Sequence, residues 1–223
     1  ASAVRAGELC KSDLVTNMVG EFDNMQGIAG YYYALNDGEN AEVAAAMNEQ
    51  YLPRFAGDAL PETITGAIIA LADRLDTISG IFGIGQQPTG SKDPFALRRA
   101  SIAALRILVE KNLALDLREL LTFAKNQHNN LTVGDELVEQ VLSYMLDRFR
   151  AFYEDANIPA EVFQAVTAKQ LSQPLDINQR VLAVNEFSKL PQAQALAAAN
   201  KRVSNILSKQ NASSNAVIHS DLL

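Results

Sequence analysis

Residues 61–80 read PETITGAIIALADRLDTISG, and this stretch decides the fold. Its apolar residues recur with the three- and four-residue spacing of one face of an α-helix. They are Ile64, Ile68, Leu71, Leu75 and Ile78. Because a proline is tolerated in the first turn of a helix and glycines follow, the stretch predicts one long helix with a buried stripe, ending near Gly80 to Gly83.

The same helical spacing continues on both sides of this stretch. Almost no segment shows the sustained alternation of apolar and polar residues that a half-buried strand requires. The sequence therefore predicts an all-α protein. The expected helices span residues 9–22, 27–38, 41–55, 61–83, 93–111, 116–126, 134–155, 160–169, 176–190 and 192–209. Residues 210–223 are polar with no clear period, so we expect an irregular tail there.

The composition is that of a chain with a hydrophobic core of its own and no cross-links. Cys10 is the only cysteine among 223 residues, which excludes an intrachain disulfide and a zinc site of several thiolates. A reducing, cytoplasmic setting is the corresponding expectation. No apolar run approaches the roughly 20 residues of a membrane span, and the first residues, Ala1-Ser-Ala-Val, indicate a chain excised from a longer one.

Net charge restricts the partners. Nineteen Lys and Arg against 26 Asp and Glu give a formal net charge of −7. Such a balance argues against attraction of the whole surface to nucleic acid or to an anionic membrane. Any contact with a polyanion must therefore come from a local basic patch.

A glycine-rich turn and a basic segment follow the long helix, in the sequence GIFGIGQQPTGSKDPFALRR at residues 80–99. The turn is close to the phosphate-binding loop G-x-x-x-x-G-K-[ST], but Ser91 intervenes before Lys92 and Asp93 stands where a hydroxyl should hold magnesium. It also follows a helix, whereas that loop follows a strand. A helix-to-helix turn that needs glycine is the simpler interpretation, with Asp93 as N-cap and Pro94 at the first helical position.

The helix expected after Asp93 carries a basic stripe. Arg98, Arg99 and Arg106 fall within about 100° of one another on an ideal helix. With Lys92 they form a candidate grip for phosphate groups, and a second basic pair, Lys201-Arg202, lies on the last helix. Ordinary ion pairing with Asp and Glu is the alternative interpretation of both clusters.

An acidic group provides the other candidate site. Asp73 and Asp76 lie three residues apart on one helix, and Asp13 on the first helix can approach them, so the three carboxylates suit a metal or acid–base chemistry. The two histidines, His128 and His219, are distant from them in sequence, and a transition-metal site would lack its imidazoles. Capping and ion pairing are favoured, and we expect no catalytic residue and no metal in this chain.

Several blocks of the sequence resemble one family in order from Gly7 to Lys209. The most specific is KDPFALRR at residues 92–99. The others include KSDLVTNMVGEF (11–22), MQGI (25–28), EQYLPRF (49–55), ADRLDT (72–77), GIFGIGQ (80–86) and ANKRVSNI (199–206). The chain resembles the β subunit of the bacterial tetrameric glycine–tRNA ligase.

The resemblance implies an interior, helical fragment of a much longer β subunit, related in fold to the HD phosphohydrolase superfamily. It implies an HD-like core at residues 1–130 and additional helices at 131–209, leading toward an anticodon-binding region outside this chain. Active HD enzymes hold metal with a histidine, a His-Asp pair and a distant Asp. Asp13 stands near the position of that pair here, and Asp73 or Asp76 near the distant Asp, as remnants of a degenerate site.

The resemblance also implies a function. Glycine activation by ATP and magnesium occurs on the separate α subunit in this family, while the β subunit binds tRNA and is required for the full reaction. We therefore expect this chain to serve tRNA(Gly) binding and subunit assembly, with the α subunit and tRNA(Gly) as partners. We expect no activity and no cofactor in the fragment itself, and no DNA or membrane partner.

The expected phosphate contacts are Lys92, Arg98, Arg99, Arg106, Lys201 and Arg202, because neutralised phosphates supply most of the non-specific affinity for nucleic acid. Two alternatives stay open. One is an active metal-dependent phosphohydrolase that uses Asp13, Asp73 and Asp76. The other is a passive spacer that contacts only protein.

Overall fold

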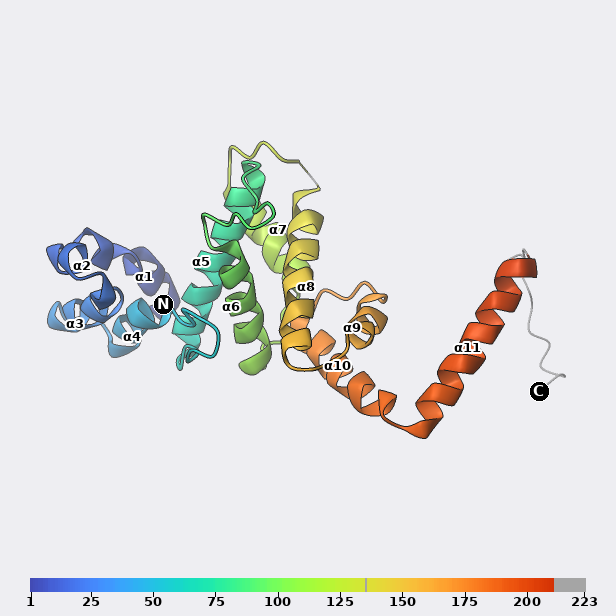
Figure 1. The fold of residues 1–223 in the computed structure, drawn as a ribbon. Helices are drawn as coiled ribbons and strands as arrows, with labels where there is room; N and C mark the ends of the chain where they lie inside the picture. Colours follow the sequence, from blue (N-terminus) through green and yellow to red (C-terminus); the bar gives the residue numbers. More distant parts are fainter. Residues whose placement is uncertain (135, 211–223) are drawn as a thin grey trace.

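The computed structural model describes residues 1–134 and 136–210, and this part of the chain is helical without strands, which confirms the all-α prediction (Figure 1). The helices are α1 (Ser2–Leu9), α2 (Asn17–Glu21), α3 (Ile28–Asn36), α4 (Ala41–Glu49), α5 (Ile64–Gly83), α6 (Leu97–Glu110), α7 (Leu117–Gln127), α8 (Leu137–Asp155), α9 (Ala160–Thr167), α10 (Pro174–Ser188) and α11 (Pro191–Gln210), with 3-10 turns η1 (Ser12–Val15) and η2 (Asp23–Met25). Apart from Gln210, which ends α11, the expected tail lies outside the described residues.

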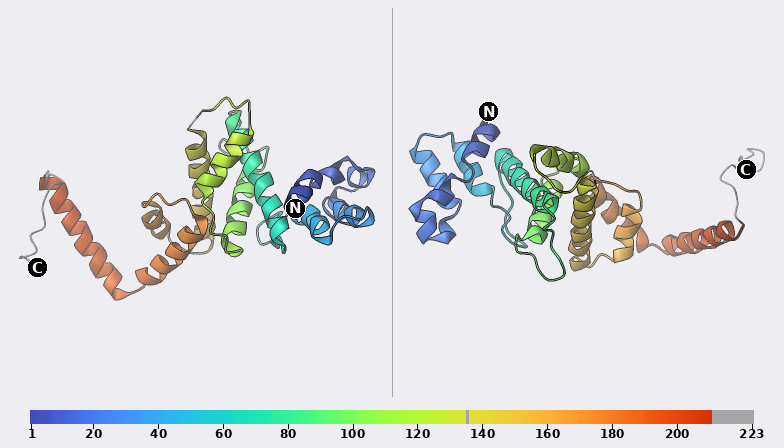
Figure 2. Two further views of the ribbon diagram at one scale, coloured as in Figure 1. Left: turned by 180° about the vertical axis from the view of Figure 1, so that it is seen from behind. Right: turned by 90° about the horizontal axis from the view of Figure 1, so that it is seen from above.

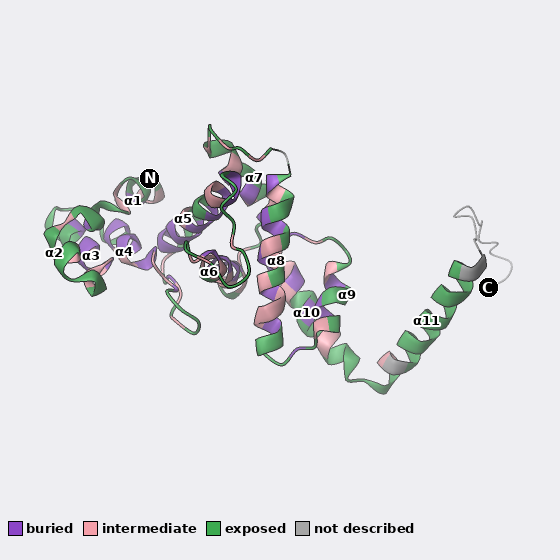
Figure 3. Cartoon of the chain, turned by 45° about the horizontal axis from the view of Figure 1, so that its top comes forward, coloured by how far each residue is buried: buried purple, intermediate pink, exposed green. Residues whose placement is uncertain are grey.

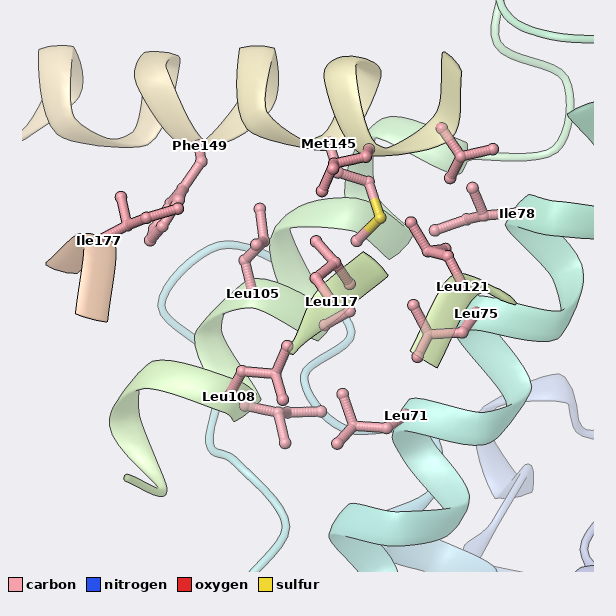
Figure 4. Close-up of a cluster of buried hydrophobic side chains, with 14 of the residues drawn as sticks. Leu71, Leu75, Ile78, Leu105, Leu108, Leu117, Leu121, Met145, Phe149 and Ile177 are labelled. Atoms are coloured by element: carbon pink, nitrogen blue, oxygen red, sulfur yellow. The ribbon is translucent and has the colours of Figure 1, made fainter. Parts of the chain in front are cut away.

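The core is built around α5. This helix packs against α6, α7 and α8, and near its N-terminal end against α1 and α4. Figure 4 shows Leu71, Leu75 and Ile78 of α5 pointing toward side chains of the three neighbouring helices. Those partners include Leu105, Leu108, Leu117, Leu121, Met145 and Phe149. Burying so many branched side chains in one cluster is the main stabilising contribution of the fold.

The N-terminal helices form a smaller layer at one end of α5 (Figure 2). Their apolar contacts are made largely by alanines, in two small clusters that join α4 to α1, α5 and α3. Short side chains let these helices approach closely but bury little apolar surface each. The position of α1 and α3 therefore depends on their packing against α4, which itself packs against α5.

The C-terminal helices leave the body of the molecule progressively. Helix α9 packs on α8, and α10 packs on α9 and α6, whereas α11 contacts the rest at α10 and then projects away (Figure 1). Figure 3 shows exposed residues along most of α11, in contrast to the buried faces of α5 and α8. No described helix is long and apolar enough to cross a membrane.

The main core crosses the expected boundary at residue 130. Leu121 and Ala124 belong to the same buried cluster as Leu137 and Val141. The division into residues 1–130 and 131–209 stays a prediction, but the helices on its two sides share one core.

Three expected elements differ from the structure near the N-terminus, and one of them is the helix predicted over residues 41–55, which ends as α4 at Glu49. The helix predicted over residues 9–22 is broken into α1, η1 and α2, and its apolar residues Leu14, Val15 and Met18 are exposed. The stripe predicted on α5 is also shorter, because Ile64 and Ile68 face outward. Over the first turns of α5 the buried face is instead formed by Thr65, Gly66, Ala67, Ile69 and Ala70, and the Glu49 side chain of α4 occupies the space beside Gly66.

The helix predicted from Asp93 begins later than expected. Helix α6 starts at Leu97, after Ala96 in the left-handed region at φ 55°. Asp93 still acts as the cap, because its carboxylate accepts hydrogen bonds from the amides of Leu97 (2.8 Å) and Arg98 (3.0 Å). The capping side chain thus closes a short loop, which leaves Phe95 partly exposed instead of buried on the helix.

Two isoleucines of the predicted stripe test the observed packing of α5. Ile78 is 0% exposed and Ile68 is 46% exposed. Ile78→Ala should lower the free energy of unfolding by about 2–5 kcal/mol, because it leaves a cavity in the core. Ile68→Ala should change it by no more than about 0.5 kcal/mol. Urea unfolding followed by circular dichroism measures both, and equal losses would contradict the orientation of α5.

The side chain of Asp116 links α7 to the segment before α10. Asp116 caps α7 by accepting from the amides of Arg118 and Glu119, and it also accepts from the Ser172 hydroxyl. Burial opposes ionisation of this carboxyl, but the hydrogen bonds from Ser172 and the two amides outweigh it and lower its pKa. The ionised carboxylate therefore stabilises the folded chain.

This link predicts an acid-sensitive contribution to stability. Because the folded pKa of Asp116 lies below its unfolded value, the contribution is complete above the ordinary value of 3.8 and is lost as the pH falls through the folded pKa. Asp116→Asn keeps a capping side chain but removes the charge. Its free energy of unfolding should fall less between about pH 6 and about pH 3 than that of the unchanged chain. Asp155→Asn, at an exposed carboxylate with no bond to any described residue, is the matched control, and identical slopes for all three chains would refute the role of Asp116.

Candidate nucleic-acid interface

The segment that follows α4 is fixed by the buried side chain of Arg74 on α5. Its guanidinium donates hydrogen bonds of 2.9–3.2 Å to backbone carbonyl oxygens. The acceptors are Gln50, Tyr51, Pro53 and, within α5, Ala70. Burial lowers the pKa of this guanidinium, and the carbonyl oxygens compensate for the water it has lost. Three of the acceptors lie in residues 50–53, so this segment is held in one position against α5.

Beyond Pro53 the chain runs beside α6, and a groove lies between residues 53–56 and that helix. This α6 groove consists of two adjoining hollows of about 210 and 390 Å³. The hollows share Pro53, Arg54, Arg99 and Ala103. The smaller hollow is mainly apolar but is lined by the arginines Arg54, Arg98, Arg99 and Arg106. A basic groove therefore exists on a chain with net negative charge.

Three of these arginines have no carboxylate partner among the described residues. Arg98 donates to the backbone carbonyls of Gly90 and Ser91, and Arg54 donates to the carbonyl of Gln26. Arg99 is exposed and makes no hydrogen bond or ion pair within the part of the chain that the structure describes. Carbonyl acceptors orient a guanidinium without cancelling its charge. The groove therefore holds three guanidinium charges that no described carboxylate neutralises.

Arg106 differs from the expectation of a free basic residue. It pairs with Glu110 one helical turn later, at 2.7 Å, and its side chain is 13% exposed. It also donates to the backbone carbonyl of Asp58 at 3.1 Å. Its remaining nitrogen, Nη1, is buried and makes no hydrogen bond to any described residue. Arg106 therefore adds little net charge but presents one unused donor.

The remaining basic residues lie elsewhere. Lys92 is exposed in the loop before α6 and does not line the groove. Lys201 and Arg202 lie on the projecting helix α11, away from α6 (Figure 1). The structure thus brings Arg98, Arg99 and Arg106 together, and it separates them from the pair on α11.

Sequence reasoning missed Arg54 and Phe55, which complete the groove. Both belong to the EQYLPRF block at residues 49–55, where the sequence predicts the end of a helix over 41–55, but α4 ends at Glu49 and leaves them in the loop that follows. The signal that could have identified them is an arginine beside an aromatic residue just outside a helix. Phe95 is a similar case, because the delayed start of α6 places it at the larger hollow.

The three expected aspartates do not converge on one site. Asp13 is buried and accepts hydrogen bonds from the amide of Gly27 (2.6 Å) and the hydroxyl of Tyr51 (3.2 Å). Burial raises the pKa of Tyr51 to about 12, so its hydroxyl remains a donor at neutral pH. Asp13 is therefore occupied as an acceptor inside the fold.

The other two aspartates have separate partners. Asp73 pairs with Lys11 at 2.9 Å, and Lys11 also lies over the ring of Tyr51. Because the Tyr51 hydroxyl donates to Asp13, Asp73 and Asp13 are linked only indirectly, through Lys11 and Tyr51. Asp76 instead lies 3.1 Å from Nε2 of His128, which the chain brings back to α5 although it is remote in sequence. The geometry does not assemble the three-carboxylate site that a phosphohydrolase would need. Among the described residues no group of three His, Cys, Asp or Glu is placed to hold a metal ion.

Within residues 1–134 and 136–210, no activated nucleophile accompanies these groups. Burial raises the pKa of the Cys10 thiol, despite the neighbouring Lys11 charge, which leaves the sulfur in its less reactive form at neutral pH. The α6 groove combines arginines that have no described carboxylate partner with an apolar lining. It is therefore suited to bind an anion that also has an apolar part.

Comparison with known proteins adds an independent finding. Residues 1–168 match the family described as glycyl-tRNA synthetase beta subunit. The chain is 62% identical over 209 residues to a glycine–tRNA ligase β subunit of Ectopseudomonas mendocina, covering 94% of this chain and 31% of that protein. It is 61% identical over 208 residues to that of Hahella chejuensis (93% and 30%) and 58% identical over 221 residues to that of Chromohalobacter salexigens (99% and 32%). The chain spans about a third of the length of these relatives. It belongs to the glycyl-tRNA synthetase β subunit family.

Proposed function

We propose that this chain supplies a tRNA(Gly)-binding surface and contacts for subunit assembly within a glycine–tRNA ligase made of α and β subunits. In this proposal the ATP- and magnesium-dependent activation of glycine takes place on the α subunit, in the cytoplasm. The isolated chain then binds RNA but catalyses no reaction and carries no cofactor. The family membership and the name of the relatives support the ligase assignment.

One observation supports the RNA-binding role most directly. Arg54, Arg98 and Arg99 gather at one groove without carboxylate partners among the described residues, on a chain whose formal charge is −7. A phosphate backbone is attracted to such a patch and repelled by the surrounding acidic surface, which restricts where the RNA can lie. The role of the α6 groove is therefore docking through phosphates.

The assembly role is supported by α11. Leu196, Val203, Ile206 and Leu207 are exposed, and on an ideal helix they fall within about 120° of one another. Lys201 falls on the opposite side of the same helix, whereas Arg202 falls at the edge of the stripe, about 40° from Ile206. An amphipathic helix that leaves its apolar stripe unburied is suited to docking in a groove of another protein segment. In that arrangement Lys201 remains outward and available to RNA, and Arg202 lies at the margin of the docked face.

The docking role predicts a specific loss with Arg99→Glu in the whole α/β enzyme. Arg99 is the better choice for substitution because Arg98 also holds the loop at Gly90 and Ser91. The apparent KM for tRNA(Gly) should rise about tenfold, equivalent to about 1.4 kcal/mol. The slope of log KM against log salt should also become shallower, because fewer counterions are released on binding. Aminoacylation kinetics at several salt concentrations measure both.

Lys169→Glu is the matched control. Lys169 is exposed after α9, makes no side-chain bond to a described residue, and its reversal changes the net charge by the same amount. It should leave KM and its salt dependence nearly unchanged. Equal effects of both reversals would mean that only total charge matters, and no effect of Arg99→Glu would refute docking at the groove.

A further inference from the structure

The smaller hollow of the α6 groove has more features than phosphate docking requires. Phosphate contacts need exposed cations, whereas Pro53, Ile102 and Ala103 give this hollow an apolar lining. Phe55 stands at the same hollow with 63% of its surface exposed. An aromatic ring that is exposed to water lacks the stabilisation that burial of its faces would give. A flat partner stacked on the ring would supply that stabilisation. These features fit a ligand that is planar as well as anionic.

Arg106 forms a rigid side of the smaller hollow. It lines this hollow, its Nη1 is buried without an acceptor among the described residues, and its other nitrogens are held by Glu110 and Asp58. A buried donor without an acceptor is unfavourable, by about 1–3 kcal/mol. Because Glu110 and Asp58 fix the rest of the guanidinium, Arg106 gives the hollow a wall of defined shape.

We propose that the smaller hollow binds one unpaired nucleotide of an RNA, with its base against Phe55 and its phosphate at Arg99 and Arg54. This proposal rests on the proposed RNA-binding function and makes it more specific. In a paired helix the bases are stacked on one another and cannot present a face to Phe55, so duplex RNA can offer the groove only its backbone. An unpaired base offers a free face that can stack on Phe55.

The groove is preorganised for this role. Arg74 fixes residues 50–53, the residues directly before Arg54 and Phe55, through carbonyl hydrogen bonds. On the other side, Asp93 caps α6 and sets the position of its first turn, which carries Arg98 and Arg99. Both walls are thus fixed by contacts outside the hollow, which reduces the entropy lost on binding.

The test measures binding of the whole α/β enzyme to a tRNA(Gly) transcript and to a blunt RNA duplex of similar length. Phe55→Ala should weaken binding of the transcript about tenfold, as expected for loss of one stacked base, and leave binding of the duplex unchanged. The salt slope should stay the same, because no charge is removed. Phe55→Trp should restore affinity, because it retains an aromatic face.

Phe123→Ala is the control, since Phe123 is also an exposed phenylalanine, 69% on α7, and does not line the groove. It should bind both RNAs normally. If Phe55→Ala binds the transcript normally while Arg99→Glu weakens binding, the nucleotide pocket is refuted and phosphate docking stands. If neither variant changes binding, both proposals fail. Equal weakening for transcript and duplex would also refute the pocket, because a duplex presents no free base.

Discussion

The buried guanidinium of Arg74 is the contact on which the functional surface depends. It replaces water with carbonyl oxygens of α5 and of residues 50–53, and hydrogen bonds to a charged group contribute about 1.5–3 kcal/mol each. The segment after α4 has no helical bonds of its own to define its path. Without Arg74, residues 50–53 would lose these bonds to α5, and the wall of the groove formed by Arg54 and Phe55 would lose its fixed position.

The arginines of this chain differ in what neutralises them, and that difference decides their use. Arg5, Arg106, Arg118 and Arg180 have carboxylate partners, and exposed pairs of this kind contribute little to stability. Arg54 and Arg98 are held by neutral acceptors and Arg99 by none of the described residues. The α6 groove therefore brings together three arginines whose charge no described carboxylate neutralises. The carboxylate of Asp73, which lines the larger hollow, is engaged by Lys11, and that of the buried Asp13 accepts from Tyr51.

Most of the helices could be predicted from the sequence because their apolar spacing and caps are local properties. Asp116 before α7 and Asn40 before α4 are capping residues in the positions where the helices begin. The prediction failed where tertiary packing overrides periodicity. Ile64 and Ile68 continue the stripe of α5, yet packing against α1 and α4 turns the neighbouring face with Ile69 inward. Asp93 was identified as a cap, but the loop that it closes was not foreseen.

The sequence by itself determined that this chain is helical, acidic, and similar to one family, since composition, periodicity and motif order are all readable along the chain. It also indicated which basic residues to consider. Only the tertiary structure decided which of them act together: Arg54 joins Arg98 and Arg99 across the groove, Arg106 is paired with Glu110, and Lys201 and Arg202 lie apart on α11. The physical reason is that the potential of a surface depends on distances between charges and on their partners, and both arise from contacts between residues far apart in sequence.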